Sequence, residues 1–444
     1  MSLFPATEYL SMMPRAFAFD VRLKAFELEG GAFLEHHIVR AALVTAHDDD
    51  ERVISRVTSL LPLVPATAPH RRTKADLENI GELPESLRLE GAIPTIVVVH
   101  ALTGDAAATV PGGYWEQLGR PGGPLSAEHA RILSFNLLGS CYGSAGPLDA
   151  GFPTRAMDRE VSPVATDGMT ASQKGEFLLP DASLPATVTT FDQAKSLLML
   201  LDALHIERVQ MIVGGSLGGM VALAATVLDP ARFATVVPLA ATHEASPWLA
   251  AWNHIARAAM IADPAFPESE RGFEIARQIG MLSYRSEADF DLLQAHDRSS
   301  LFSGPAAPQS GSGGWSPRSP SRIARYLEHQ GRKLRTRFHP SAHLCLLASM
   351  DHHHLERRGE AFDELAKTYV AGVAIDSDVL YTPIQTDRYL AMIEERGGCV
   401  LHETLSSIHG HDAFLIEWEG LERIFAKIAE WRSEREADVR GKTK

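Results

Sequence analysis

A serine set between glycines, in the stretch Gly214–Gly219, constrains the fold more than any other part of this 444-residue chain. The apolar run Val209–Val213 before it favours a buried strand, and the run Met220–Ala225 after it favours a helix. A Gly-x-Ser-x-Gly sequence between a strand and a helix is typical of a sharp turn that presents the serine, Ser216, as a nucleophile. Side chains at the flanking positions would collide in such a turn, which explains the glycines. The N–H groups at the start of the helix favour developing negative charge.

Other apolar runs predict the sheet to which this turn belongs. The β-branched run Pro94–His100 lacks polar alternation, as expected of a strand that is covered on both faces in a parallel sheet. The runs Phe191–Leu204 and Trp418–Trp431 predict helices, and the charged tail after the second is expected to fray. Together these elements predict an α/β-hydrolase fold, in which helices flank a mostly parallel sheet. The remaining predicted strands are Ala18–Leu23 and His37–Val44 at the edge, then Ala130–Asn136, Thr235–Ala240 and Val370–Ile375.

The chain is longer than the roughly 250–300 residues that one compact core normally uses. The stretch 244–364 has amphipathic helical patterns in place of alternating strands and helices, apart from the polar segment Ser303–Gly314. We therefore expect a hydrolase core formed by residues 1–243 and 365–444, with residues 244–364 inserted as a helical cap. The polar stretch 48–92 is expected to form an exposed loop.

Charge and cysteine content exclude several classes of function. The formal net charge of -14 argues against nucleic-acid binding, and no apolar run of about 18 residues predicts a membrane span. The first residues lack the pattern of a secretory signal, and three widely spaced cysteines suit a reducing cytoplasm. No metal site is predicted, because consecutive side chains in the run His352–His354 would point in different directions on a helix.

A nucleophile in such a turn requires an acidic residue and then a histidine later in the chain. Asp376 and Asp378 follow the last predicted core strand, and Asp378 is favoured because the turn after it leads toward a helix. His411 is the favoured base because it lies on a loop just before the terminal helices, with His409 and His402 as alternatives. With the serine, these residues predict a Ser-His-Asp catalytic triad.

Taken together, these motifs resemble those of the homoserine O-acyltransferases of methionine biosynthesis, and among them the homoserine O-acetyltransferases. The resemblance covers roughly residues 94–431, and the combined motifs are much more specific than the serine turn alone. The matching segments are His100–Asp105, Asn136–Pro147, Gly214–Met220, Asp263-Pro264, Ala276-Arg277 with Tyr284, Ser377-Asp378 and Gly410–Leu415.

The resemblance implies that Ser216 is the nucleophile and that Asp378 and His411 are its partners. It implies further that the N–H groups of Leu102 and Leu217 form the oxyanion hole. The implied reaction moves an acetyl group from acetyl-CoA, a co-substrate and not a bound cofactor, to the hydroxyl of L-homoserine. The acetyl group would pass through an acyl-serine intermediate in a ping-pong sequence.

For the amino-acid acceptor, the resemblance implies that Arg277 holds the carboxylate, that Tyr284 assists, and that Asp412 faces the ammonium group. An arginine suits this task because its guanidinium fork matches the two oxygens of a carboxylate. The resemblance also implies a homodimer that forms through the cap helices.

The chain departs from the family pattern at three places, which are Pro153–Ser183, Ser303–Pro320 and Phe338–Ser341. All three lie in or near the cap, which shapes the substrate pockets. Serine as the acceptor and succinyl-CoA as the donor therefore stay open as alternatives. Hydrolysis of an ester by the same triad is a further alternative, although Arg277 and Asp412 suit a zwitterionic amino acid.

Overall fold

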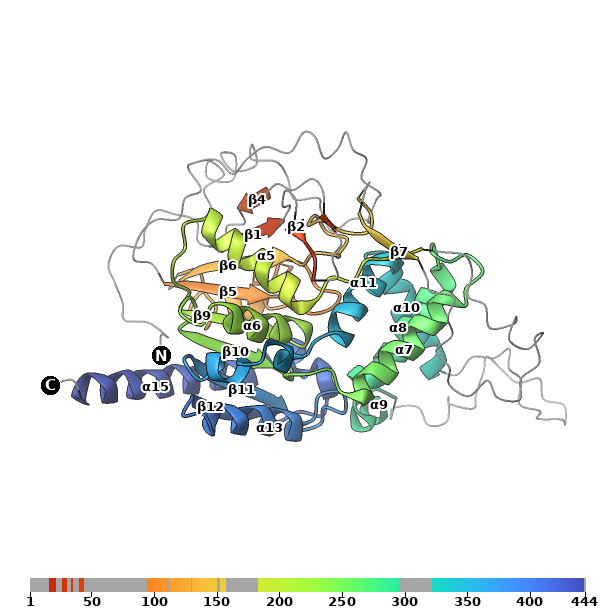
Figure 1. The fold of residues 1–444 in the computed structure, drawn as a ribbon. Helices are drawn as coiled ribbons and strands as arrows, with labels where there is room; N and C mark the ends of the chain where they lie inside the picture. Colours follow the sequence, from red (N-terminus) through yellow and green to blue (C-terminus); the bar gives the residue numbers. More distant parts are fainter. Residues whose placement is uncertain are drawn as a thin grey trace, which may run out of the picture.

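The computed structural model describes residues 16–20, 26–29, 33–34, 40–43, 94–109, 112–128, 130–149, 152–156, 183–294 and 322–442. Within them, the main sheet has eight strands in the order β12-β11-β10-β9-β5-β6-β1-β4 (Figure 1). Neighbouring strands pair in parallel, except that β4 lies antiparallel to β1 at one edge. The predicted α/β fold with a mostly parallel sheet is therefore confirmed.

Most strands lie close to the apolar runs that predicted them. The exception is β12, an unpredicted strand whose residues are mostly half-buried or exposed because it forms the other edge of the sheet. The strands of the main sheet are β1 (Ala16–Asp20), β4 (Arg40–Leu43), β5 (Thr95–Val99), β6 (Arg131–Asn136), β9 (Met211–Gly215), β10 (Thr235–Leu239), β11 (Tyr369–Ile375) and β12 (Cys399–Leu405). Two further two-stranded antiparallel sheets pair β2 (Phe26–Glu27) with β3 (Phe33–Leu34) and β7 (Thr154–Ala156) with β8 (Ser183–Pro185).

Alternate residues of the central strands enter two different cores. Val97 and Val99 of β5 pack in the core that contains the apolar residues of α5, α6 and α13, whereas Ile96 and Val98 pack in the core that contains those of α15. Both faces of the sheet are thus covered, as the unbroken apolar run of β5 predicted. The helices of the hydrolase core are α3 (Glu116–Gly119), α5 (Thr190–Ala203), α6 (Leu217–Leu228), α13 (Pro383–Glu394), α14 (Ala413–Ile416) and α15 (Trp418–Lys442).

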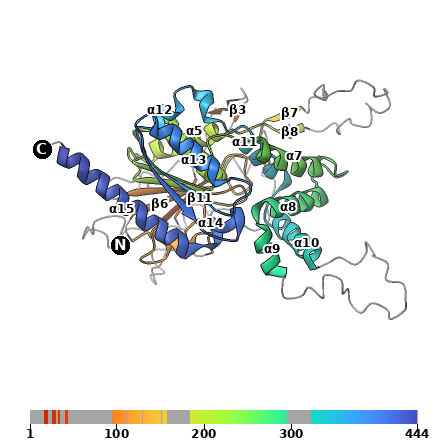
Figure 2. The same cartoon turned by 90° about the horizontal axis from the view of Figure 1, so that it is seen from below.

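The last helix is longer than predicted. We expected a helix over Trp418–Trp431 with a frayed tail, but α15 continues to Lys442 and projects away from the sheet (Figure 2). Within the extension, Arg432 pairs with Glu436 one turn later and also donates to the Ala234 carbonyl oxygen at 3.2 Å. Across the described ranges, neither α15 nor any other helix is long and apolar enough to cross a membrane.

Between β10 and β11 the described residues are helical, and Figures 1 and 2 both show most of these helices beside one end of the sheet. One of them, α12, packs instead on α6 of the hydrolase core. The predicted polar segments Ser303–Gly314 and 48–92 lie outside the described residues. The helices of this stretch are α7 (Pro247–Ile261), α8 (Glu270–Tyr284), α9 (Glu287–Gln294), α10 (Arg322–Arg335), α11 (Pro340–Asp351), the 3-10 helix η3 (Leu355–Arg358) and α12 (Ala361–Leu365).

We expect Gly218→Ala to destabilise the fold by about 3 kcal/mol, because the added carbon would lie 2.2 Å from the Val99 carbonyl oxygen. Gly397→Ala is the control: its added carbon meets no described atom within 4 Å, and only a φ of 77° opposes it. That change should cost about 1 kcal/mol. Thermal unfolding compares the two variants. Equal losses of thermal stability in the two variants would show that the close approach of α6 to β5 does not limit the stability of the fold.

Candidate active site

The predicted strand–turn–helix is present around Ser216, which lies between the end of β9 and the start of α6. Its backbone has φ 55° and ψ -124°, a conformation that non-glycine residues rarely adopt. The Ser216 N–H donates to the Leu239 carbonyl oxygen at 2.9 Å. A side chain on Gly214 would lie 2.4 Å from the backbone of Gly218, so both glycines are needed for the chain to turn here.

The structure brings Asp378 and His411 together in a buried hydrogen bond. The Nδ1 atom of His411 lies 2.6 Å from Oδ2 of Asp378 and donates to it, because a carboxylate can only accept. The other carboxylate oxygen, Oδ1, accepts from the N–H groups of Leu380 at 2.7 Å and Tyr381 at 2.9 Å. This arrangement leaves Nε2 of His411 as the nitrogen that can accept a proton.

The alternative acid and the alternative bases that the sequence left open do not take part in this pair. Asp376 accepts hydrogen bonds from two serines, Ser406 at 2.6 Å and Ser407 at 3.0 Å. Nδ1 of His409 lies 2.7 Å from the buried carboxylate of Asp289, which belongs to α9. His402 lies exposed on β12. Of the candidate acids and bases, only Asp378 and His411 are paired with each other in the described structure.

Aromatic rings surround the His411 imidazole and hold its orientation. The ring centroid of Tyr381 lies 5.0 Å away, that of Phe414 5.4 Å and that of Tyr284 6.0 Å. Ser216 and His411 are each 4% exposed and Asp378 is 3% exposed, so bulk water has little access to the three side chains.

Tyr381 is a site residue that the sequence reasoning missed. Burial raises the pKa of its hydroxyl well above the usual range, and the Asp378 carboxylate raises it further. The Ser216 side chain opposes part of this rise, although the two hydroxyl groups do not reach the geometry of a full hydrogen bond. A neutral phenol therefore lies beside the serine. Its position three residues after Asp378, in the turn whose N–H groups hold that carboxylate, is the signal that could have identified it.

The loop after β5 carries Leu102, and buried hydrogen bonds fix its start. The His100 ring donates from Nδ1 to the Ala101 carbonyl oxygen at 2.8 Å and accepts at Nε2 from the Leu137 N–H at 3.1 Å. Burial lowers the pKa of His100, which favours the neutral ring that both bonds require. Arg337 also holds this loop.

Arg337 reaches the loop after β5 from the link between α10 and α11. Arg337 donates to the Thr103 carbonyl oxygen at 2.6 Å and to the Tyr142 hydroxyl at 3.0 Å. The N–H groups of Leu102 and Leu217, the predicted oxyanion hole, donate to no other residue that the structure describes. Both amides are thus free to donate to a substrate oxygen.

The three predicted acceptor residues are near the histidine. The Arg277 guanidinium lies 5.4 Å above the ring of Tyr284, which in turn packs against His411. Burial raises the pKa of the Tyr284 hydroxyl, while Arg277 lowers it and Asp412 raises it. The structure adds a residue that the sequence did not indicate, because Nε of Arg285 donates to Oδ2 of Asp412 at 3.1 Å.

Comparison with known proteins identifies the fold and the family of the chain. The family model for the alpha/beta hydrolase fold matches residues 94–324. The homoserine O-acetyltransferase of Thermus thermophilus is 33% identical over 354 residues, which span 74% of this chain and 80% of that protein.

Solved structures show the same fold. The homoserine O-acetyltransferase of Staphylococcus aureus superposes with a TM-score of 0.61 at 21% identity, over 93% of this chain and 95% of that one. Esterase E22 superposes with a TM-score of 0.63 at 13% identity, over 93% of this chain and 100% of that one. Fold and sequence similarity together lead to one assignment: the chain belongs to the homoserine O-acetyltransferase family of the α/β hydrolases.

Proposed function

We propose that this protein transfers an acetyl group from acetyl-CoA to the hydroxyl of L-homoserine, with Ser216, His411 and Asp378 as its catalytic triad. The observation that carries the proposal is the buried 2.6 Å hydrogen bond between His411 and Asp378, in a chain that belongs to this family. Homoserine as the acceptor and acetyl as the transferred group follow from the relatives, which are homoserine O-acetyltransferases.

In the first half-reaction, Nε2 of His411 takes the proton of the Ser216 hydroxyl, and the serine oxygen attacks the thioester carbonyl carbon. The Asp378 carboxylate holds the imidazole in the tautomer that can accept this proton and stabilises the positive charge that develops. The N–H groups of Leu102 and Leu217 donate to the oxyanion. The C–S bond then breaks, His411 returns the proton to the sulfur, and CoA leaves from an acyl-serine.

In the second half-reaction, His411 deprotonates the hydroxyl of the amino acid, which attacks the acyl-serine. The ester of the amino acid forms, the bond to Ser216 breaks, and the serine recovers its proton from His411. The low exposure of the site favours this route over attack by water, because few water molecules can reach the acyl-serine.

Charge near the triad supports an amino-acid acceptor. Arg277, which lies over the ring of Tyr284, would bind the carboxylate through its guanidinium fork. Asp412 would bind the ammonium through Oδ1, because Oδ2 already accepts from Arg285. A reaction with serine as the acceptor or succinyl-CoA as the donor would use the same site residues, and these are the alternatives within this chemistry.

An esterase is the alternative from another class, and one observation favours it. Arg285 already supplies a positive charge to Asp412, which reduces the attraction that this carboxylate can offer an ammonium group. Measurement of CoA release with and without homoserine separates the two. Release that does not depend on the amino acid, with free acetate as the product, would support the hydrolase.

Incubation with acetyl-CoA and no acceptor should add one acetyl mass to a peptide that contains Ser216. Ser216→Ala should abolish this label, because it removes the attacking oxygen, and His411→Ala should slow labelling by roughly 10²–10⁴-fold, the contribution of general-base catalysis. His409→Ala is the matched control and should acylate within about tenfold of the parent, since His409 contacts Asp289 and not Asp378. A label on another residue, or equal losses from the two histidine variants, contradicts the assignment.

Arg277→Ala should reduce transfer to the amino acid by about ten- to a hundredfold, because a charge-assisted contact contributes roughly 1.5–3 kcal/mol to binding. Acylation of Ser216 should change little, because the donor does not use this arginine. Single-turnover measurements of the two half-reactions test the difference. Arg271→Ala, which removes an exposed arginine from the same helix, is the control. If Arg277→Ala slows acylation as much as transfer, the arginine serves the donor or the fold.

We also propose that two copies associate through the cap. Five large apolar side chains lie exposed on its described helices: Trp248 and Ile255 on α7, Ile275 and Leu282 on α8, and Leu292 on α9. Apolar groups exposed together on a surface are typical of protein–protein contacts. Sedimentation should give a dimer for the parent and a monomer for Ile255→Glu. A monomeric parent would rule out this association.

A further inference from the structure

A group of side chains of the types that can bind a metal ion lies where the chain enters and leaves the cap. His243 and Glu244 lie between β10 and α7, and Glu356 lies on η3. We call the two segments, residues 241–246 and 352–358, the cap neck. They run antiparallel, with an isolated bridge between Glu244 and His354. The Leu355 N–H donates to the His243 carbonyl oxygen at 2.9 Å. The Ala245 N–H donates to the His353 carbonyl oxygen at 2.8 Å.

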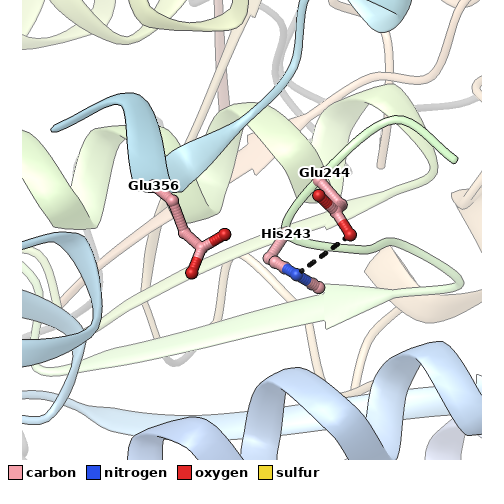
Figure 3. A group of neighbouring side chains, drawn as sticks. All are labelled: His243, Glu244 and Glu356. Carbon is pink, nitrogen blue, oxygen red and sulfur yellow. Dashed lines mark ion pairs between the residues drawn. The ribbon is translucent and has the colours of Figure 1, made fainter. Parts of the chain in front are cut away.

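The three side chains face one another across the cap neck. Figure 3 shows the His243 imidazole with the Glu244 carboxylate on one side and the Glu356 carboxylate on the other. One imidazole nitrogen and one oxygen from each carboxylate all lie within 4.8 Å of one another. Donors bound to a zinc ion lie about 3.3 Å apart, so small rotations of the glutamate side chains would complete such a site.

The imidazole provides the second line of evidence. His243 is 2% exposed, and its Nε2 atom is buried without a hydrogen-bond partner among the described residues. The nearest carboxylate oxygen, Oε1 of Glu244, lies 3.6 Å away, which is too long for a hydrogen bond. Buried polar atoms are normally satisfied, so a ligand for this nitrogen is expected. On the other side of the ring, Nδ1 lies 3.5 Å from the Thr242 hydroxyl, a contact of the kind that orients metal-binding histidines.

Two cationic or titratable side chains also approach this group. Arg388 lies 3.7 Å from Oε1 of Glu244, and Nε2 of His354 lies 3.6 Å from Oε2. Arg388 is 65% exposed, so it can swing into water when a metal ion takes its place. Glu356 is exposed as well, which gives an ion a path from solvent.

We propose that His243, Glu244 and Glu356 bind a divalent transition-metal ion, best matched by Zn²⁺, that joins the two segments of the cap neck. One imidazole and two carboxylates form a donor set that zinc accepts, and their two negative charges balance the ion. Water would complete the coordination on the exposed side. Nothing in the sequence indicated this site, because the proposed ligands come from segments far apart in the chain. The run His352–His354 begins only where α11 has ended, so it does not lie on a helix, contrary to the sequence-based expectation.

The role of the ion is structural. The cap connects to the hydrolase core through the cap neck, so an ion bound to both segments would restrain the motion of the cap relative to the core. Binding to the folded chain alone would also raise thermal stability.

The test uses the full-length protein without an affinity tag, stripped with a chelator and titrated with ZnCl₂ by calorimetry. We expect one Zn²⁺ per chain. Glu356→Gln should weaken binding by at least about tenfold, because it removes a ligand from an exposed position without disturbing the core. Glu360→Gln, which changes another exposed glutamate a few residues later, should bind zinc like the parent. No stoichiometric binding, or equal binding by Glu356→Gln, overturns the proposal.

Hydrogen exchange locates the ion independently. Zinc should slow exchange at the amides of Ala245 and Leu355, whose hydrogen bonds join the cap neck, in the parent and in Glu360→Gln. The protection should be absent in Glu356→Gln. Zinc that binds elsewhere, for example at the catalytic histidine, would leave these two amides unchanged and would also overturn the proposal.

Discussion

The backbone of Ser216 lies in a conformation that only close packing can maintain, and the site depends on that packing. Gly218 approaches the Val99 carbonyl, and Gly215 lies against the Phe414 ring, where an added carbon would meet the ring at 2.4 Å. The same Phe414 ring packs edge-on against His411. One aromatic residue thus closes on the serine turn and also supports the base, so the strain at the serine and the position of the histidine are linked.

The helices between β10 and β11 contribute to the order of the site. Arg285, at the end of α8, bonds to Asp412 beside the histidine and to the buried Asp289 of α9 at 2.8 Å. His409 bonds to Asp289 from the other side, and Ser286 donates to the Ile408 carbonyl oxygen. The loop that carries His411 is therefore held by the cap through buried or half-buried polar contacts. A displacement of α8 and α9 would therefore shift the position of His411.

The serine turn, the central strands and the Asp378–His411 pair were predictable because each depends on local pattern and chain order. The strand β12 was not, since a half-exposed edge strand with polar residues such as His402 and Glu403 lacks an apolar run. Nor was the length of α15, because its last turns are charged and lack an apolar run. Contacts such as that of Arg285 with Asp412 join distant segments, and one sequence contains no signal for which charges will meet. Tyr381 lay within a recognised turn, but its closeness to the serine required the fold.

The order of the parts along the chain affects how such an enzyme is made. The serine turn is synthesised before the cap, whereas Asp378 and His411 follow it. At typical rates of about 5–20 residues per second, the histidine emerges roughly 10 to 40 seconds after the serine. During that interval Phe414 does not yet cover Gly215, and the edge of the sheet at β12 is completed only shortly before His411. A nascent chain that ends before Asp378 therefore lacks two members of the proposed catalytic triad.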